Sequence, residues 1–252
     1  MFSPVRISIL FITGLAAGFV DSIAGGGGLI TLPVLLSLGL PPKVALGTNK
    51  LQACFGSGSA SWHYTRGKVV HLADCARGFL FSLAGAAAGS CAVQQADPSL
   101  LRRVIPILLI AVSLVMLIRP ELGATDVRPR MKRDLFDMTF GLGIGFYDGF
   151  FGPGTGTFWT MAFMLFLGFN MTRATGYTKV MNFASNLSSL VAFLIPGNVL
   201  LVEGMVMGAG QLLGARLGAG MVIERGPKFI RPIFIFVVIA LTAKLLYGAY
   251  VK

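Results

Sequence analysis

Long apolar runs, separated by short polar or glycine-rich stretches, fill almost the whole chain. A helix of about 20 apolar residues crosses the hydrocarbon core of a bilayer, so each long run predicts a membrane segment. We expect five helical segments before a polar stretch at 119–134 and five after it. Their approximate ranges are 6–24, 29–40, 44–64, 72–95 and 101–118, then 136–151, 155–169, 172–194, 200–223 and 229–250.

Segments 29–40 and 155–169 are shorter than the others. The first has 12 residues, which is about 18 Å of helix at 1.5 Å per residue and too short to cross a membrane alone. Each segment follows a glycine-rich break, at 25–28 in the first half and at 152–156 in the second. We therefore expect half-helices or the return arms of hairpins at both places.

The composition identifies these runs as parts of a membrane protein. Of 252 residues, 55% are hydrophobic and 12% are charged, whereas about a quarter of the residues in soluble domains are charged. The mean hydropathy is +0.78, and together these values exclude a soluble enzyme, a disordered chain and a collagen-like fibre. The net charge of +11 belongs in loops, because a nucleic-acid site needs a water-facing basic surface. We expect the lipid bilayer as surroundings and no nucleic-acid partner.

The two halves of the chain resemble each other. The matching stretches are GLAAGFVDSIAG (14–25) with GLGIGFYDGFFG (141–152), and VALGTNKL (44–51) with RATGYTKV (173–180). They pair Asp21 with Asp148 and Lys50 with Lys179, at offsets of 127 and 129 residues. Glycine matches alone would be weak evidence in a chain with 33 glycines, but Asp and Lys recur in the same order. The sequence therefore predicts two homologous repeats, 1–118 and 135–252, joined by a basic polar linker at 119–134.

Loop charges favour an inverted relation between the repeats. Arg and Lys concentrate in 66–71, in the linker and in 225–231, whereas 196–203 carries only Glu203. Cytoplasmic loops of membrane proteins are enriched in these residues. Placing the basic loops in the cytoplasm turns the halves upside down relative to each other and leaves both termini outside. The predicted fold class is an all-α polytopic membrane protein of two inverted repeats; a parallel arrangement is the less favoured alternative.

The glycine breaks are candidate anion sites. Where a helix begins inside a membrane, its first N–H groups lack acceptors and carry the positive end of the helix dipole. Glycine lets an anion approach this backbone closely. The candidate substrate-binding residues at the breaks are Gly25, Gly26, Gly27, Gly28, Gly152, Gly154, Thr155 and Gly156. The alternative is tight helix packing, which we prefer for Gly85, Gly89, Gly214 and Gly218.

Lys50 and Lys179 are the ionisable residues best placed to bind an anion. Both lie in long apolar segments, where a charged group usually faces a cavity and has a partner. The polar residues beside them complete the candidate substrate site: Thr48, Asn49 and Gln52 in the first repeat, and Thr178, Asn182 and Asn186 in the second. The alternative for each Lys is snorkelling to the headgroups.

Asp21 and Asp148 each precede a glycine break by four residues. Each is a candidate for proton coupling, and each is equally suited to permanent pairing with Lys50 or Lys179. We also expect an ion pair between Asp74 and Arg77. The three cysteines and two histidines have no metal-ligand spacing, so we expect neither a metal nor a cofactor.

At these motifs the chain resembles the sulfite exporter TauE/SafE family, also called the toluene-sulfonate uptake permease family, and especially its YfcA-like branch. The matching stretches are GFVDSIAGGGGLITLP (18–33), LGTNKLQA (46–53), GFYDGFFGPGTGTF (145–158) and TKVMNFASN (178–186). The resemblance implies a multi-pass protein of the bacterial inner membrane. It also implies transport of sulfite, sulfonates or related small organic anions. Pro153 and Thr155 replace part of a glycine run that many members have.

Together these features predict a secondary transporter that moves a small anion by alternating access around a midplane site. The substrate would be a sulfur-containing oxyanion, an organosulfonate or a small carboxylate. The chain has no P-loop and is expected not to be an enzyme. An anion channel is the main alternative. An intramembrane aspartyl hydrolase is less favoured, because both Asp residues have the same sequence surroundings and no G-x-G-D motif follows. A homodimer is left open.

Overall fold

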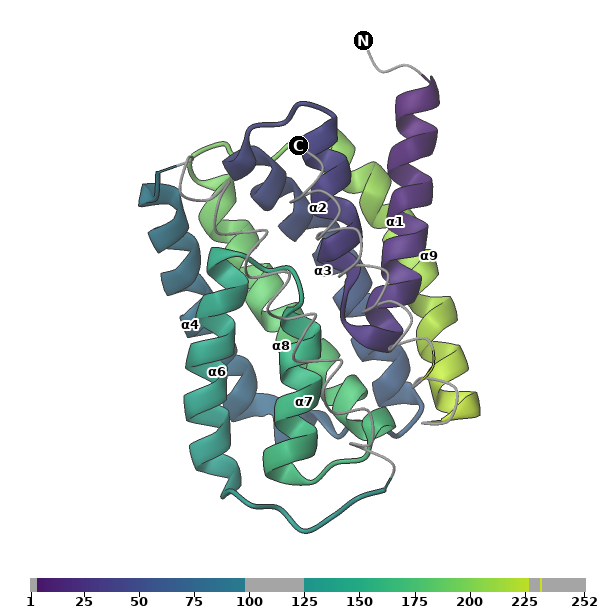
Figure 1. Ribbon diagram of the computed structural model, residues 1–252, viewed down its shortest axis with the longest axis vertical. Helices are drawn as coiled ribbons and strands as arrows, with labels where there is room; N and C mark the ends of the chain where they lie inside the picture. Colours follow the sequence, from purple (N-terminus) through teal and green to yellow (C-terminus); the bar gives the residue numbers. More distant parts are fainter. Residues whose placement is uncertain (1–3, 98–124, 227–231, 233–252) are drawn as a thin grey trace, which may run out of the picture.

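The computed structural model describes residues 4–97, 125–226 and 232, and its regular elements are all helical (Figure 1). They are α1 (Pro4–Ala24), α2 (Gly27–Ser37), α3 (Pro42–Arg66), the 3-10 helix η1 (Leu72–Cys75), α4 (Ala76–Gln95), α6 (Arg133–Phe150), α7 (Thr155–Leu167), α8 (Met171–Leu194) and α9 (Leu201–Arg225). The expected segments 101–118 and 229–250 lie outside the described residues, as do linker residues 119–124. The other eight expected segments are confirmed to within a few residues at each end.

Among the described residues, three stretches are long and apolar enough to cross a membrane: Pro4–Ala24, Leu72–Gln95 and Leu201–Arg225. Helices α2 and α7 have only 11 and 13 residues, as the sequence predicts for the two short segments. Helices α3 and α8 have 25 and 24 residues, but polar side chains buried along them lower their mean hydropathy. The all-α membrane class is therefore confirmed.

The described helices form two bundles. The first bundle contains α1, α2, α3 and α9, and the second bundle contains α4, α6, α7 and α8. In Figure 1 the purple helix α1 runs along the yellow-green α9, and α6 runs along α4. Each bundle therefore contains one helix from the opposite half of the chain. The main contact between the bundles is that of α3 with α8.

Glycines allow the close contacts within each bundle. A Cβ atom on Gly214 would lie 2.0 Å from the carbonyl oxygen of Leu15 in α1, and one on Gly85 would lie 2.4 Å from that of Leu142 in α6. Gly89 and Gly218 are equally close to α6 and α1. Small residues let helix backbones approach closely in membranes. The packing role expected for these four glycines is confirmed.

Helices α3 and α8 run antiparallel. The loop after α3 reaches the start of α8, where the Tyr177 hydroxyl lies 3.5 Å from the His71 amide nitrogen. The loop after α8 reaches the start of α3, where the Leu200 amide donates to the Thr48 hydroxyl at 3.0 Å. This is the geometry that inverted halves require. The inverted duplication itself stays a prediction.

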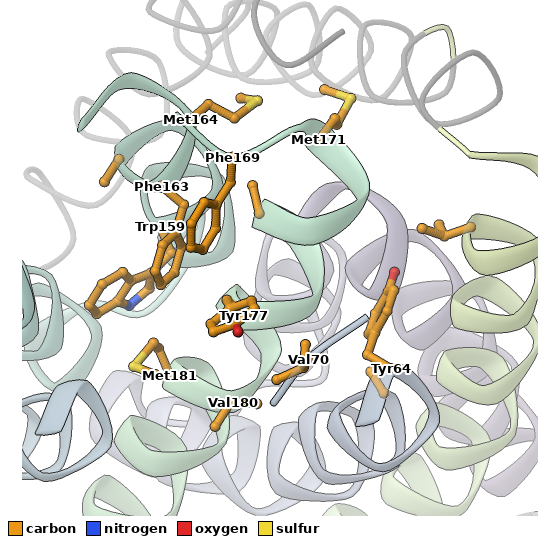
Figure 2. Packing of buried hydrophobic residues seen from close by; sticks show 14 of the residues in the cluster. Tyr64, Val70, Trp159, Phe163, Met164, Phe169, Met171, Tyr177, Val180 and Met181 are labelled. Carbon is orange, nitrogen blue, oxygen red and sulfur yellow. The ribbon is translucent and has the colours of Figure 1, made fainter. Parts of the chain in front are cut away.

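An aromatic cluster packs around the C-terminal end of α7. Phe163 and Phe169 stack with their ring centroids 5.6 Å apart, and Tyr177 packs against both rings (Figure 2). The Arg133 guanidinium lies 5.4 Å from the Tyr177 ring centroid and pairs with Asp137. Cation–π contacts of this kind stabilise the packing. The cluster fixes one end of α7 while the other end begins in the protein interior.

One predicted ion pair is wrong. Arg77 pairs with Asp134 at the start of α6, and not with Asp74. Asp74 lies in η1, before α4 begins, so it does not share a helix face with Arg77. Its carboxylate instead accepts a hydrogen bond of 3.0 Å from the Tyr177 hydroxyl.

Candidate functional site

The two glycine breaks meet at the boundary between the bundles. A Cβ atom on Gly25 would lie 2.5 Å from the carbonyl carbon of Gly156, and one on Gly28 would lie 3.4 Å from Pro153. Gly25, Gly152 and Gly154 have φ between +76° and +87°, which residues with a Cβ rarely adopt. Glycine is therefore needed here both for the backbone conformation and for the close approach of two chains.

A cavity of about 30 Å³ lies where the breaks meet. It is lined by Asp21, Gly25, Gly28, Asn49, Ala53, Asp148, Gly152, Gly154, Thr155, Gly156, Asn182, Asn186 and Gln211. A single water molecule needs a cavity of about 10–15 Å³, so this cavity has room for only a very small molecule. Both short helices begin at this cavity, which means that two helix N-termini from different halves of the chain converge on it.

Most of the expected site residues line this cavity, and all the others except Thr48 lie next to its lining. Lys50, Lys179, Gln52, Thr178 and Gly27 are bonded to the lining or to the short helices. Gly26 is the residue before α2 begins. Thr48 is different, because its hydroxyl accepts from the Leu200 amide and so anchors a loop.

Each buried lysine pairs with an aspartate of the opposite bundle. The Lys50 ammonium lies 2.5 Å from Asp148 Oδ1 and donates to the Asp148 carbonyl oxygen at the same distance. The Lys179 ammonium lies 2.9 Å from Asp21 Oδ2. Of the two interpretations left open by the sequence, the structure has the aspartates paired with the lysines. Both pairs cross the boundary between the bundles, and in this state neither ammonium is free for a substrate.

The remaining carboxylate oxygens of the two pairs have different partners. Asp148 Oδ2 accepts a hydrogen bond from the Ser185 hydroxyl, and its side chain is 4% exposed. Asp21 Oδ1 accepts from the backbone N–H of Gly27, the first residue of α2, at 3.1 Å, and its side chain is 15% exposed. Asp21 therefore occupies the positive end of a helix, whereas Asp148 is enclosed by side chains.

Two threonines tie the short helices to α3 and α8. Thr31 of α2 donates to Asn49 Oδ1 at 2.5 Å, and Thr160 of α7 lies 3.1 Å from the Thr178 hydroxyl. Sequence reasoning missed both threonines. They are 129 residues apart, the same offset as Lys50 and Lys179, so extending the repeat alignment into the short helices would have found them.

Gln211 of α9 is a further site residue that sequence reasoning missed. It is 1% exposed, and its Oε1 has no hydrogen-bond partner among the described residues. The same is true of Asn182 Oδ1 on the other side of the cavity. A Cβ atom on Gly56 would lie 2.5 Å from Gln211 Cγ, so this glycine makes room for the side chain. The repeat alignment places Ser82 opposite Gln211 and therefore gave no signal.

The formal charges and the helix dipoles around the cavity balance one another. Asp21, Asp148, Lys50 and Lys179 carry two charges of each sign when all are ionised, so they cancel. The N-termini of α2 and α7 each add the equivalent of roughly half a positive charge, and the C-termini of α1 and α6, which end at the same breaks, each add roughly half a negative charge. The helix N-termini and the side-chain amides offer hydrogen-bond donors that can orient a bound oxyanion, although these charges sum to about zero. No group of three or more metal-ligating side chains occurs within 4–97 and 125–226.

Comparisons with known proteins agree on the kind of protein. The family model "Sulfite exporter TauE/SafE" matches residues 10–245. The probable membrane transporter protein YfcA of Escherichia coli K12 is 44% identical over 250 residues, which cover 99% of this chain and 93% of the relative. A probable membrane transporter protein of Haemophilus influenzae is 45% identical over 96% of this chain and 94% of its own length. YunE of Bacillus subtilis, also a probable membrane transporter, is 27% identical over 95% and 97%.

No solved structure matches this chain. The family model covers most of the residues, and the relatives match along nearly their whole length. The chain therefore belongs to the sulfite exporter TauE/SafE family of membrane transporter proteins.

Proposed function

We propose that this protein is a secondary transporter that carries a small anion through the bacterial inner membrane. The observation that carries the proposal is the convergence of two helix N-termini, from α2 and α7, on one cavity between the bundles. Half-helix N-termini at the midplane of two related halves are how several transporter folds hold anionic substrates. The family name and the two helix N-termini at the cavity support an oxyanion, such as sulfite, a sulfonate or a small carboxylate.

The movement that we propose is a rocking of the two bundles about α3 and α8. The cavity lies at their boundary, and the ion pairs Lys50–Asp148 and Lys179–Asp21 cross that boundary. Opening one side of the boundary and then the other would give the site alternating access to the two faces of the membrane. The described state, with its cavity of about 30 Å³, represents a closed intermediate in this scheme.

Anion binding tests the proposal directly. Detergent-purified protein is heated with sulfite, sulfate, thiosulfate, sulfoacetate, taurine or short carboxylates, each as its sodium salt and matched for ionic strength. A ligand at 100 times its Kd stabilises the folded state by about 2.7 kcal/mol, which is a clear rise in melting temperature. Equal stabilisation by every sodium salt would assign the effect to the cation and overturn the assignment. In liposomes, saturable exchange of the stabilising anion supports a carrier, and unsaturable current supports a channel.

A pair of glycine variants tests whether the anion binds at the cavity. A Cβ atom on Gly156 would lie 2.6 Å from Gly25 Cα and 3.0 Å from Asn182 Nδ2, so Gly156→Ala should abolish stabilisation by the anion. Gly220→Ala is the matched control, because a Cβ atom there meets nothing within 4 Å. Equal stabilisation of both variants would contradict binding at the meeting point of the breaks.

A further inference from the structure

We infer that Asp21 is a tethered anion occupying the substrate's place, and that binding of the transported anion is coupled to protonation of this carboxylate. The inference rests on the proposed function and adds its coupling ion. Asp21 Oδ1 accepts from the first N–H of α2 and Oδ2 accepts from the Lys179 ammonium. These are the groups that an incoming oxyanion needs.

The chain is shaped to bring this carboxylate to the helix end. A Cβ atom on Gly27 would lie 2.8 Å from Asp21 Cβ, so glycine is required for the approach. Asn182 and Gln211 are buried beside it and line the same cavity, each with an amide oxygen that has no partner in the described part of the chain. The cavity therefore presents polar groups that its own side chains do not satisfy.

Displacement of Asp21 by a substrate leaves a carboxylate without its two partners. An unpaired charge in a poorly solvated site is costly, and a carboxylate removes this cost by binding a proton. The exchange is balanced: the anion takes the place of the Asp21 charge at Lys179 and α2, and one proton neutralises the displaced carboxylate. The anion and the proton then cross together, and for a singly charged anion the net charge of the site is unchanged.

Asp148 is unsuited to this role. Its side chain is 4% exposed and is held by both the Lys50 ammonium and the Ser185 hydroxyl. Lys50 also donates to the Asp148 carbonyl oxygen, so this pair joins a side chain to a helix end of the opposite bundle. The Lys50–Asp148 pair is therefore a structural connection, and the more accessible Lys179–Asp21 pair is the exchangeable one.

Within the part of the chain that the structure describes, the ionisable neighbours of Asp21 are few. Lys179 of α8 contacts it, and Tyr64 of α3 donates to the neighbouring Ser22 carbonyl. Helices α2 and α7 contain no ionisable side chain. In α9, Glu203 pairs with Arg6, whereas Arg216, Glu224 and Arg225 are exposed. Across the cavity lies the Lys50–Asp148 pair.

The test uses sulfate and methanesulfonate, which do not titrate between about pH 5.5 and about pH 8.5. Wild-type protein should bind the anion up to about tenfold more tightly for each unit that the pH falls, because one proton binds with it. Asp21→Asn should bind more tightly than wild type at pH 8.5 and with no pH dependence. Ser185→Ala, beside Asp148, and a His63→Gln/His71→Gln variant, which removes both histidines of the chain, should keep the wild-type slope.

Proton uptake by the wild-type protein gives a readout that needs no variant. Adding methanesulfonate to protein in weakly buffered solution should remove about one proton per bound anion from solution. Anion binding without proton uptake, or a slope retained by Asp21→Asn, would overturn the coupling and leave the proposed function intact. Failure of every tested anion to bind wild-type protein at any pH would overturn the proposed function as well.

Discussion

At the scale of single residues, the main feature is that each buried lysine has its counter-ion on the other bundle. Lys50 and Lys179 are at most 1% exposed, and a charge so deeply buried needs a partner of opposite sign. The pairing also changes the interpretation of the lysines. They connect the two bundles, and in the mechanism proposed above Lys179 becomes available to an anion only when Asp21 leaves.

The Lys50–Asp148 pair predicts a test by charge removal. Asp148→Asn leaves the Lys50 ammonium buried without a counter-charge, and should lower the free energy of unfolding by about 3–5 kcal/mol. Lys50→Met combined with Asp148→Asn removes both charges and should recover most of that loss. Thermal melts followed by circular dichroism in detergent measure both. A double variant no more stable than Asp148→Asn would argue against a direct interaction.

Gln211 predicts a separation of stability from binding. Gln211→Met keeps the length of the side chain and removes a buried amide with an unsatisfied oxygen, so the melting temperature should stay level or rise. Loss of one hydrogen bond to the anion should weaken its binding by roughly 2- to 10-fold. Leu213→Met on the exposed face of α9 is the control. Unchanged anion affinity in Gln211→Met would remove Gln211 from the site.

At the scale of helices, the two breaks decide where α2 and α7 begin. Gly25 precedes α2 with φ +76°, and Gly154 precedes α7 with φ +82°. The loop before α7 is held by the Tyr147 hydroxyl, which donates to the Pro153 carbonyl at 2.8 Å, and by the Thr155 hydroxyl, which donates to Gly152. Because both helices begin in the interior, their first N–H groups point into the protein and not into water.

Gly25→Ala tests the contact between the two breaks, and Gly39→Ala is the matched control. Gly39 has φ +82°, but a Cβ atom there meets nothing within 4 Å, whereas one on Gly25 would lie 2.5 Å from Gly156. Gly39→Ala should lower the free energy of unfolding only by the backbone strain that it introduces, about 1–2 kcal/mol. Gly25→Ala should lower the free energy of unfolding by a further ~1–3 kcal/mol because of overpacking, and it should also abolish anion binding. Equal melting temperatures would mean that the breaks do not touch.

At the scale of the whole molecule, α3 and α8 run antiparallel, so the loops that follow them lie at opposite ends of this helix pair. Helix α3 has 25 residues, about 38 Å at 1.5 Å per residue. The loop after α3 contacts the start of α8, and the loop after α8 contacts the start of α3. An inverted topology with basic loops in the cytoplasm therefore places Lys68 inside and Pro196 outside.

Cysteine labelling measures this topology. In a chain whose three free cysteines (Cys54, Cys75 and Cys91) have been replaced, a membrane-impermeant maleimide added to intact spheroplasts should label Pro196→Cys. Lys68→Cys should be labelled only after permeabilisation, because both positions are exposed but lie at opposite ends of the central helices. Labelling of both positions from the same side would exclude the inverted arrangement.

The sequence by itself determined the membrane class, the positions of the helices and most of the cavity lining. Apolar runs and glycine breaks are local signals, and hydrophobic transfer and backbone sterics act on them wherever the chain goes. The repeat alignment also singled out both Asp–Lys sets before any geometry was known. It left open whether the aspartates pair with the lysines, because spacing along a chain does not state which side chains meet.

Tertiary structure alone decided the partners. The packing of the two bundles at α3 and α8 brings Lys50 to Asp148 and Lys179 to Asp21. The packing of α9 in the first bundle brings Gln211 to the cavity, although the repeat alignment gives it no polar amide counterpart. The structure also separates two aspartates that the sequence treats as equivalent: Asp148 is enclosed with Ser185, whereas Asp21 caps α2. The physical reason is that charge compensation in a membrane depends on distance in space, which only the packing of the bundles fixes.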